Sequence, residues 1–176
     1  ISSYGEPTFE ETKIEVTSLK KQESINKKNY HLIVNENEID KWINEAEELG
    51  EIAIDTETNS LDAHQADLIG ISLSTKIGKA CYIPIGHKSK GCLKKEVVLK
   101  KLKPLLEDKS VKKIGQNIKF DFIILYKNGI NMSSMEDTML MSYVLDAGKN
   151  RHNMDILSEI HLQHKTISFK EIVGAG

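Results

Sequence analysis

The sequence predicts one α/β domain in which a mixed β-sheet is flanked by helices, and three observations lead to this fold class. The chain has 176 residues, 39% of them hydrophobic, which is enough for a single sizeable core. Short β-prone runs separated by a turn over residues 52–85 predict an antiparallel meander. Beyond residue 95, helical and strand patterns alternate, which favours strands added in parallel.

The chain divides into an arm and a domain. Residues 1–28 are polar, lack hydrophobic periodicity and include a stretch rich in Lys, Glu and Ser, so we expect a linker or loosely attached arm. Residues 29–176 are expected to form the domain. No apolar run is long enough to cross a bilayer, and the first residues carry no signal-peptide pattern. We therefore expect a cytoplasmic monomer with no membrane partner.

The domain is expected to begin with a strand over residues 31–34. Asn37 can cap a helix that runs from about Glu38 to Leu49, and Gly50 can end it. The apolar run of residues 52–54 suits a central strand that is buried on both faces.

Two further strands are expected to complete the meander. Residues 68–74 and 80–85 have the β-prone composition, and residues 76–79 form the turn between them. Helical spacing of apolar residues follows over residues 95–107, with Pro104 as an expected kink or restart.

The last elements alternate between strand and helix, without an internal repeat. The expected elements are a strand over 112–115 and helices over 120–128, 137–145 and 154–162. Gly129 can end the first of these helices, and Asp137 can cap the second.

Composition narrows the possible functions only in part. The net charge of -2 provides no general excess of cations for nucleic acid, although lysines crowd residues 88–119. Charge therefore permits nucleic-acid binding without arguing for it. Cys81 and Cys92 are too few for a disulfide framework, and neither they nor His161 and His164 have partners at the spacing of a zinc site.

Two acidic residues at the end of the expected central strand are the first candidates for a metal site. Asp55 and Glu57 are two residues apart, so both carboxylates leave the same face of a strand. Oxygen ligands suit Mg²⁺ or Mn²⁺, and a cation would offset the cost of placing two like charges side by side. The same spacing also arises by chance at solvated strand ends.

A second cluster lies at the start of the helix after the strand over 112–115. Asn117 and Asp121 are four residues apart and share a helix face, so Asp121 could meet the first pair beside the sheet. Gln116 and Asn117 could hold a ligand or a phosphate through hydrogen bonds. Asn117 could also cap the helix.

Several stretches of this sequence resemble a known family. The chain contains D-T-E-T-N-S-L, then G-Q-N-I-K-F-D, then D-T-M-L-M-S-Y-V-L. Together with residues 151–155 and 164–169, they are similar to the proofreading exonuclease domain of bacterial DNA polymerase I, over about residues 30–176. The resemblance implies a ribonuclease H-like fold and the hydrolysis of single nucleotides from the 3' end of DNA.

The resemblance also implies roles for residues at the matching positions. Two divalent cations, Mg²⁺ or Mn²⁺, would be held by Asp55, Glu57 and Asp121. Substrate contacts with the terminal nucleotides and phosphates are implied for seven residues: Thr58, Leu61, Gln116, Asn117, Phe120, Arg151 and Phe169. For Leu61 and Phe169 the alternative is core packing, and for Arg151 it is a surface salt bridge. The implied partners are a single-stranded DNA 3' end and the polymerase domain of the same parent chain.

One part of the family pattern is not found in this sequence. The third motif, Y-x-x-x-D, would supply a tyrosine and a fourth carboxylate, but Tyr143 is followed at that spacing by Ala147, and Tyr126 by Ile130. We therefore expect a domain that is incomplete at its C-terminal end. Such a piece would hold one cation or none and would have weak activity or none.

Three other functions stay open. The domain could be a catalytically vestigial scaffold inside a polymerase, although the three carboxylates argue against this. It could be a free-standing ribonuclease of the same superfamily, although the stretch from His164 resembles the polymerase branch. It could also be a nucleic-acid-binding module without catalysis, whose binding would survive removal of metal.

Overall fold

The structure is a computed structural model that describes residues 29–87, 91–167 and 171. The expected arm, residues 1–28, and the candidate residue Phe169 lie outside the described residues. Within the described part of the chain, no helix combines the length and apolar character needed to span a bilayer.

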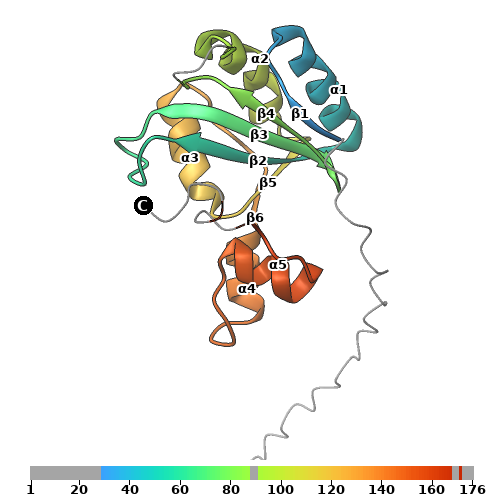
Figure 1. Ribbon diagram of the computed structural model, residues 1–176, viewed down its shortest axis with the longest axis vertical. Helices are drawn as coiled ribbons and strands as arrows, with labels where there is room; N and C mark the ends of the chain where they lie inside the picture. Colours follow the sequence, from blue (N-terminus) through green and yellow to red (C-terminus); the bar gives the residue numbers. More distant parts are fainter. Residues whose placement is uncertain (1–28, 88–90, 168–170, 172–176) are drawn as a thin grey trace, which may run out of the picture.

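A six-stranded mixed sheet forms the centre of the described domain, in the order β1-β4-β3-β2-β5-β6 (Figure 1). The strands are β1 Tyr30–Leu32, β2 Glu51–Thr58, β3 Leu68–Lys76, β4 Lys79–Pro84, β5 Lys112–Gly115 and β6 Met135–Asp137. β2, β3 and β4 form the predicted antiparallel meander, whereas β1, β5 and β6 each run parallel to a neighbour. The mixed sheet is therefore confirmed. β6 was not predicted, because its three residues contain no β-prone run.

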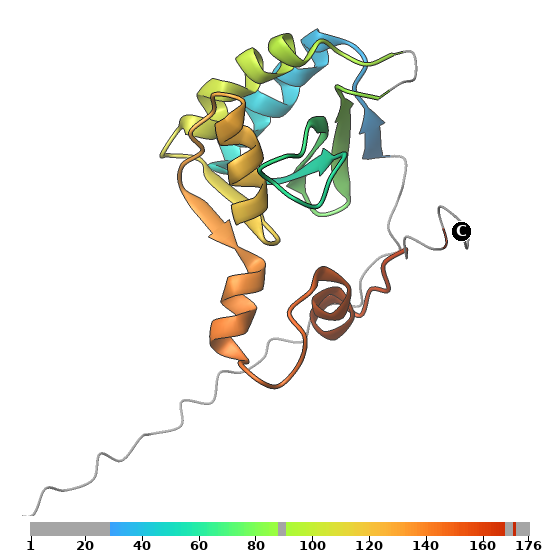
Figure 2. The same ribbon diagram turned by 90° about the vertical axis from the view of Figure 1, so that its left-hand side faces the viewer.

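The helices pack mainly against one face of this sheet. They are α1 Ile39–Leu49, α2 Lys95–Glu107, α3 Ile118–Lys127, α4 Thr138–Leu145 and α5 Met154–Leu162. α1 and α2 lie side by side, α1 contacts β2 and β3, and α3 contacts β2 and β6. α4 and α5 extend away from one end of the sheet (Figures 1 and 2). Pro104 lies inside α2, which continues to Glu107 as predicted.

The core lies between the sheet and these helices, because apolar residues alternate along the central strands. Every second residue of β2 is buried, and these residues meet buried apolar side chains of α1, α2 and α3, among them Ile39, Leu102, Leu106 and Ile124. The opposite face of β2 carries Ala53 and Asp55, which are only half-buried. The prediction of a strand buried on both faces is therefore wrong, since the helices pack on one face of β2.

Two of the predicted helix caps are also wrong. α1 is preceded by a 3-10 turn, η2 (Glu36–Glu38), which is capped by Asn35 and not by Asn37. The Asn35 side chain accepts a hydrogen bond of 3.0 Å from the backbone N–H of Asn37. Asn117 precedes α3, but its side chain makes no capping bond, because the N-terminal amides of α3 are bonded elsewhere. Gly50 ends α1 with φ of 71°, as predicted.

β5 contains a fully buried lysine that its sequence pattern does not predict. The Nζ of Lys113 donates hydrogen bonds of 2.5 Å to the carbonyl of Asp108 and 2.6 Å to that of Val111, and the residue is 0% exposed. Burial lowers the pKa of Lys113, since the charged form loses its hydration. The two carbonyl bonds satisfy the ammonium group and stabilise the turn between α2 and β5.

Candidate active site

β2 presents two carboxylates on the face of the sheet opposite the one that α1, α2 and α3 cover. In the register of the sheet, Asp55 lies opposite Ser72 and Glu57 lies opposite Gly70 of β3. Asp55 is half-buried, whereas Glu57 is exposed. Their spacing within one strand places both side chains on this face, as the sequence predicts.

α3 brings a third carboxylate, Asp121, to the edge of β2. Its Oδ1 accepts hydrogen bonds from the backbone N–H (2.7 Å) and from the Oγ1 (2.6 Å) of Thr56, and the residue is only 3% exposed. β5 pairs with β2 only as far as Ala53, so the edge of β2 beside Thr56 has no neighbouring strand. Asp121 accepts the backbone hydrogen bond of Thr56 that a neighbouring strand would otherwise accept. Thr56 lies between Asp55 and Glu57 in β2, and this contact brings Asp121 near enough for its charge to act on Asp55.

Two of these carboxylates, Asp55 and Asp121, bind protons more strongly than they would in water. Burial, followed by the negative charges of Asp121 and Glu57, raises the pKa of Asp55 from 3.8 to about 6. Burial also raises the pKa of Asp121, although the hydrogen bonds from Thr56 partly counter this rise. A cation beside these groups would therefore relieve an unfavourable concentration of negative charge.

The donor set fits a hard divalent cation in kind. Carboxylate oxygens are the ligands that Mg²⁺ and Mn²⁺ prefer. The negative charges of Asp121 and Glu57, which help to raise the pKa of Asp55, would also attract a cation. Within the described ranges, however, no three His, Cys, Asp or Glu side chains already converge as a closed set of ligands. The pair His161 and His164 accordingly has no third ligand among the described residues.

Gln116 connects the start of α3 with the region of α4 and α5. Its Nε2 donates a hydrogen bond of 2.7 Å to the carbonyl of His152, and its Oε1 accepts one of 2.6 Å from the Oγ1 of Thr138. The next residue, Asn117, has a left-handed backbone with φ of 59°. The amide group of Gln116 is thus engaged within the protein, and a contact with substrate would have to share or replace these bonds.

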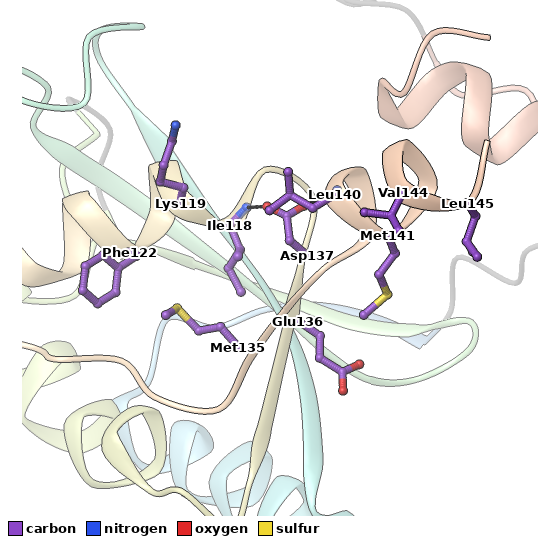
Figure 3. Close-up of a pocket in the computed structure, with 10 residues that line it drawn as sticks. All are labelled: Ile118, Lys119, Phe122, Met135, Glu136, Asp137, Leu140, Met141, Val144 and Leu145. Carbon is purple, nitrogen blue, oxygen red and sulfur yellow. Dashed lines mark hydrogen bonds between the residues drawn. The ribbon is translucent and has the colours of Figure 1, made fainter. Parts of the chain in front are cut away.

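Asp137 caps two helices at once. Its carboxylate accepts hydrogen bonds of 2.9 to 3.4 Å from four backbone amides, two at the start of α4 and two at the start of α3: Met139, Leu140, Asn117 and Ile118. Figure 3 shows the bond from Ile118. Sequence reasoning identified the cap of α4 but missed the cap of α3. The latter fixes the start of the helix that carries Asp121.

The loop between β2 and β3 presents an apolar side chain to solvent. Leu61 is 98% exposed, so the alternative of core packing is wrong for this residue. Thr58, at the end of β2, is half-buried, and its Oγ1 donates a hydrogen bond of 2.9 Å to the carbonyl of Ser60. Both residues lie close in sequence to Glu57.

The remaining substrate candidates differ in their surroundings. Phe120 is half-buried and packs against the core, which limits its surface for a ligand. Arg151 is exposed and forms no ion pair with another described residue, so the expected alternative of a surface salt bridge is not observed in this part of the chain. Its side chain is therefore accessible to an anion.

Two hollows lie near these residues. A cavity of about 280 Å³ is lined by Asp55 together with small and apolar residues of β2, β3 and β4, and it reaches Gln116 and Met154. A wider groove of about 710 Å³ lies between α3 and α4 and is lined mostly by apolar side chains (Figure 3). None of the three candidate carboxylates lines the wider groove, and Asp55 is the one that lines the smaller cavity.

Comparison with known proteins gives a consistent match. A family model described as 3'-5' exonuclease matches residues 30–176. DNA polymerase I of Rhizobium leguminosarum is 44% identical over 159 residues, which cover 78% of this chain and 16% of that protein. DNA polymerase I of Pseudomonas aeruginosa is 41% identical over 153 residues, covering 84% of this chain and 17% of that protein. The chain thus spans about a sixth of the length of these relatives.

Solved structures share the fold. Brucella melitensis NrnC with bound Mg²⁺ is 23% identical with a TM-score of 0.59, over 84% of this chain and 68% of that chain. The POL domain of Pol1 from M. smegmatis, in complex with DNA primer-template and dNTP, is 17% identical with a TM-score of 0.64, over 81% of this chain and 24% of that chain. At these identities the likeness shows the fold alone, and it agrees with the predicted ribonuclease H-like arrangement.

Proposed function

This chain belongs to the family of 3'-5' exonuclease domains that DNA polymerase I proteins contain, and we propose that it hydrolyses the terminal nucleotide from a single-stranded DNA 3' end. One observation carries the proposal. Thr56, which lies between Asp55 and Glu57 in β2, holds Asp121 by two hydrogen bonds, and the charges of Asp121 and Glu57 help to raise the pKa of Asp55. In the proposed setting the domain works beside the polymerase domain of one parent chain and removes misincorporated nucleotides.

The proposed site would hold divalent cations, Mg²⁺ or Mn²⁺, through Asp55, Glu57 and Asp121. It would hold two where the fourth carboxylate of the family pattern is present, and one or none with these three residues alone. When bound, such ions neutralise the phosphate oxygens and make a water molecule easier to deprotonate. The chain contributes the anchoring of Asp121 by Thr56 and the fixing of α3 by Asp137, which keep the carboxylates in place. In the reaction, the water oxygen attacks phosphorus and the 3' oxygen of the preceding nucleotide leaves.

Binding of the strand is assigned to residues around the carboxylates. Leu61 offers an exposed apolar surface against which a base can pack, and such packing tolerates any base, as proofreading requires. Arg151 is accessible to a phosphate. The further proposed contacts are Thr58, Gln116, Asn117, Phe120 and Phe169.

The proposal is tested by Asp55→Asn in the full parent chain, with Mn²⁺ and a 3'-labelled single-stranded DNA oligonucleotide. We expect the rate of nucleotide release to fall on the order of 100-fold or more, because the side chain that would hold the cations loses its negative charge. The matched control is Glu48→Gln, which removes one exposed carboxylate of α1, a helix that carries none of the candidate residues, and should leave the rate unchanged.

The outcomes also separate the other functions. Unchanged trimming by Asp55→Asn would overturn the assignment of the site. Trimming of an RNA oligonucleotide but not of DNA would favour a ribonuclease. If the unmodified protein binds DNA in the presence of EDTA but never trims it with Mn²⁺, it is a binding module or a scaffold.

A further inference from the structure

The loop between β2 and β3, residues 59–67, is ordered by hydrogen bonds within itself. Its two ends are joined, because Asn59 Nδ2 donates to Asp67 Oδ2 (3.1 Å) and the Asp67 backbone N–H donates to Asn59 Oδ1 (2.8 Å). Near the tip, the carboxylate of Asp62 accepts a hydrogen bond of 2.9 Å from the backbone N–H of His64. The loop therefore has few internal degrees of freedom left.

The same loop has an inner and an outer side. Ala63 and Ala66 are 9% and 2% exposed and belong to the hydrophobic core. Leu61 points the other way, since it is 98% exposed. An ordered loop thus holds a large apolar side chain in water, which costs free energy unless a ligand covers it.

Lys127, the last residue of α3, binds the backbone of this loop through its side chain. Its Nζ donates to three loop carbonyls, those of Ala63 (3.1 Å), His64 (2.7 Å) and Ala66 (2.9 Å). An ammonium group has three N–H donors, so these bonds use all of them. Lys127 consequently has no donor left for a phosphate, and a direct contact with DNA is not its role.

α3 therefore reaches both parts of the site. Its first turn carries Asp121, which is bonded to Thr56 beside the carboxylates, and its last residue carries the contact with the loop. Lys127 lies six positions after Asp121, which corresponds to about 9 Å along a helix. One rigid helix thus connects the contact beside the carboxylates with the contact to the loop that carries Leu61.

We propose that Lys127 is a positioning residue, which holds the loop of residues 59–67 so that Leu61 meets the 3'-terminal bases of the strand. This inference rests on the proposed function. The physical basis is preorganisation, because a loop that is already ordered loses less conformational entropy when the strand binds.

The test measures binding of a fluorescent single-stranded DNA by anisotropy in EDTA, so that the strand is not cut. Lys127→Met keeps the aliphatic stem and removes the donors, and we expect it to weaken binding about fivefold. Lys127→Arg restores donors and should recover most of the affinity.

Leu61→Ala should weaken binding roughly tenfold. Adding Lys127→Met to Leu61→Ala should then change the affinity by less than about twofold, since the positioned side chain is gone.

Two further measurements separate positioning from charge and from stability. Lys41→Met removes an exposed lysine of α1 and should leave the affinity unchanged. Amide hydrogen exchange of residues 63–67 should become faster in Lys127→Met, while the temperature of global unfolding stays close to that of the unmodified protein.

Unchanged exchange in Lys127→Met would overturn the inference, and so would an equal loss of affinity with and without Leu61. These outcomes are distinct from failure of the proposed function. If Asp55→Asn abolishes trimming but Lys127 and Leu61 act independently, only the inference is wrong. If the two residues are coupled in binding but the protein never trims DNA, the hydrolytic function is wrong and the inference stands for binding.

Discussion

Asp55 shows how a single residue of this site is tuned by what folding places around it. In the unfolded chain its carboxyl group is hydrated and far from Asp121. In the folded protein burial and the charges of Asp121 and Glu57 raise its pKa to about 6. Thr56 stabilises the ionised form of Asp121 by two hydrogen bonds, whereas two negative charges disfavour the ionised form of Asp55. Asp55 is the group that a cation would relieve.

This shift predicts a pH dependence for the metal-free protein. Because the folded protein holds the Asp55 proton more strongly than the unfolded chain, the free energy of unfolding should fall as the pH rises. The contribution of Asp55 is complete below its ordinary pKa of 3.8 and is lost as the pH rises through about 6. In EDTA, the temperature of thermal unfolding should therefore fall as the pH rises from about 4 to above 6. The fall should be smaller in Asp55→Asn, because the amide does not titrate. Parallel profiles for the two proteins would contradict the prediction.

At the scale of elements, the tight turn from β5 into α3 decides where Asp121 lies. Gly115 ends β5 beside Ile118, and a Cβ on Gly115 would come within 2.9 Å of that side chain. Asn117 then takes the left-handed conformation that starts α3. The first amides of α3 have no partner within the helix, and the carboxylate of Asp137 accepts two of them.

We predict that Asp137→Ala lowers the free energy of unfolding by about 2 to 3 kcal/mol, which is more than one helix cap contributes. The reason is that four backbone amides at two helix starts lose their acceptor. Chemical denaturation measures the loss. Asn35→Ala, which removes a single capping bond from η2, is the comparison and should cost about 1 kcal/mol. Equal losses in the two variants would show that the bonds to α3 contribute nothing.

At the scale of the whole molecule, the sheet separates packing from chemistry. Its helix-covered face holds the core, and the opposite face of β2 carries Asp55 and Glu57. Asp121 reaches them at the strand edge that β5 leaves open. Asp55 and Glu57 therefore lie outside the hydrophobic core, half-buried and exposed respectively. Substitutions at these two positions should change ligand binding more than the free energy of unfolding.

Binding of metal should therefore stabilise the whole domain. A cation that binds only the folded protein adds about 2.7 kcal/mol to the free energy of unfolding when its concentration is 100 times its Kd. We expect Mn²⁺ to raise the temperature of thermal unfolding, and Asp55→Asn to lose most of this rise while Glu48→Gln keeps it. An equal rise in Asp55→Asn would mean that the ion binds elsewhere.

Local patterns of the sequence were sufficient for much of the fold. The bounds of α2, β5 and α5 agree with their predictions, because hydrophobic periodicity and breakers act within one segment. The common face of Asp55 and Glu57 follows from the period of a strand. The motifs pointed to the family that the comparisons show.

The tertiary structure decided what depends on contacts between distant segments. The bonds from Thr56 to Asp121 span 65 residues, and the contact from Lys127 to the loop spans 61 to 64. No periodicity encodes such contacts, because they form where the unpaired backbone groups of a strand edge, a helix start or a loop meet a side chain from elsewhere. The sequence by itself determined most of the elements, the family and the candidate carboxylates, but it did not determine β6 or η2. Folding alone determined that Asp121 binds Thr56, between Asp55 and Glu57, since that depends on where β5 stops pairing with β2.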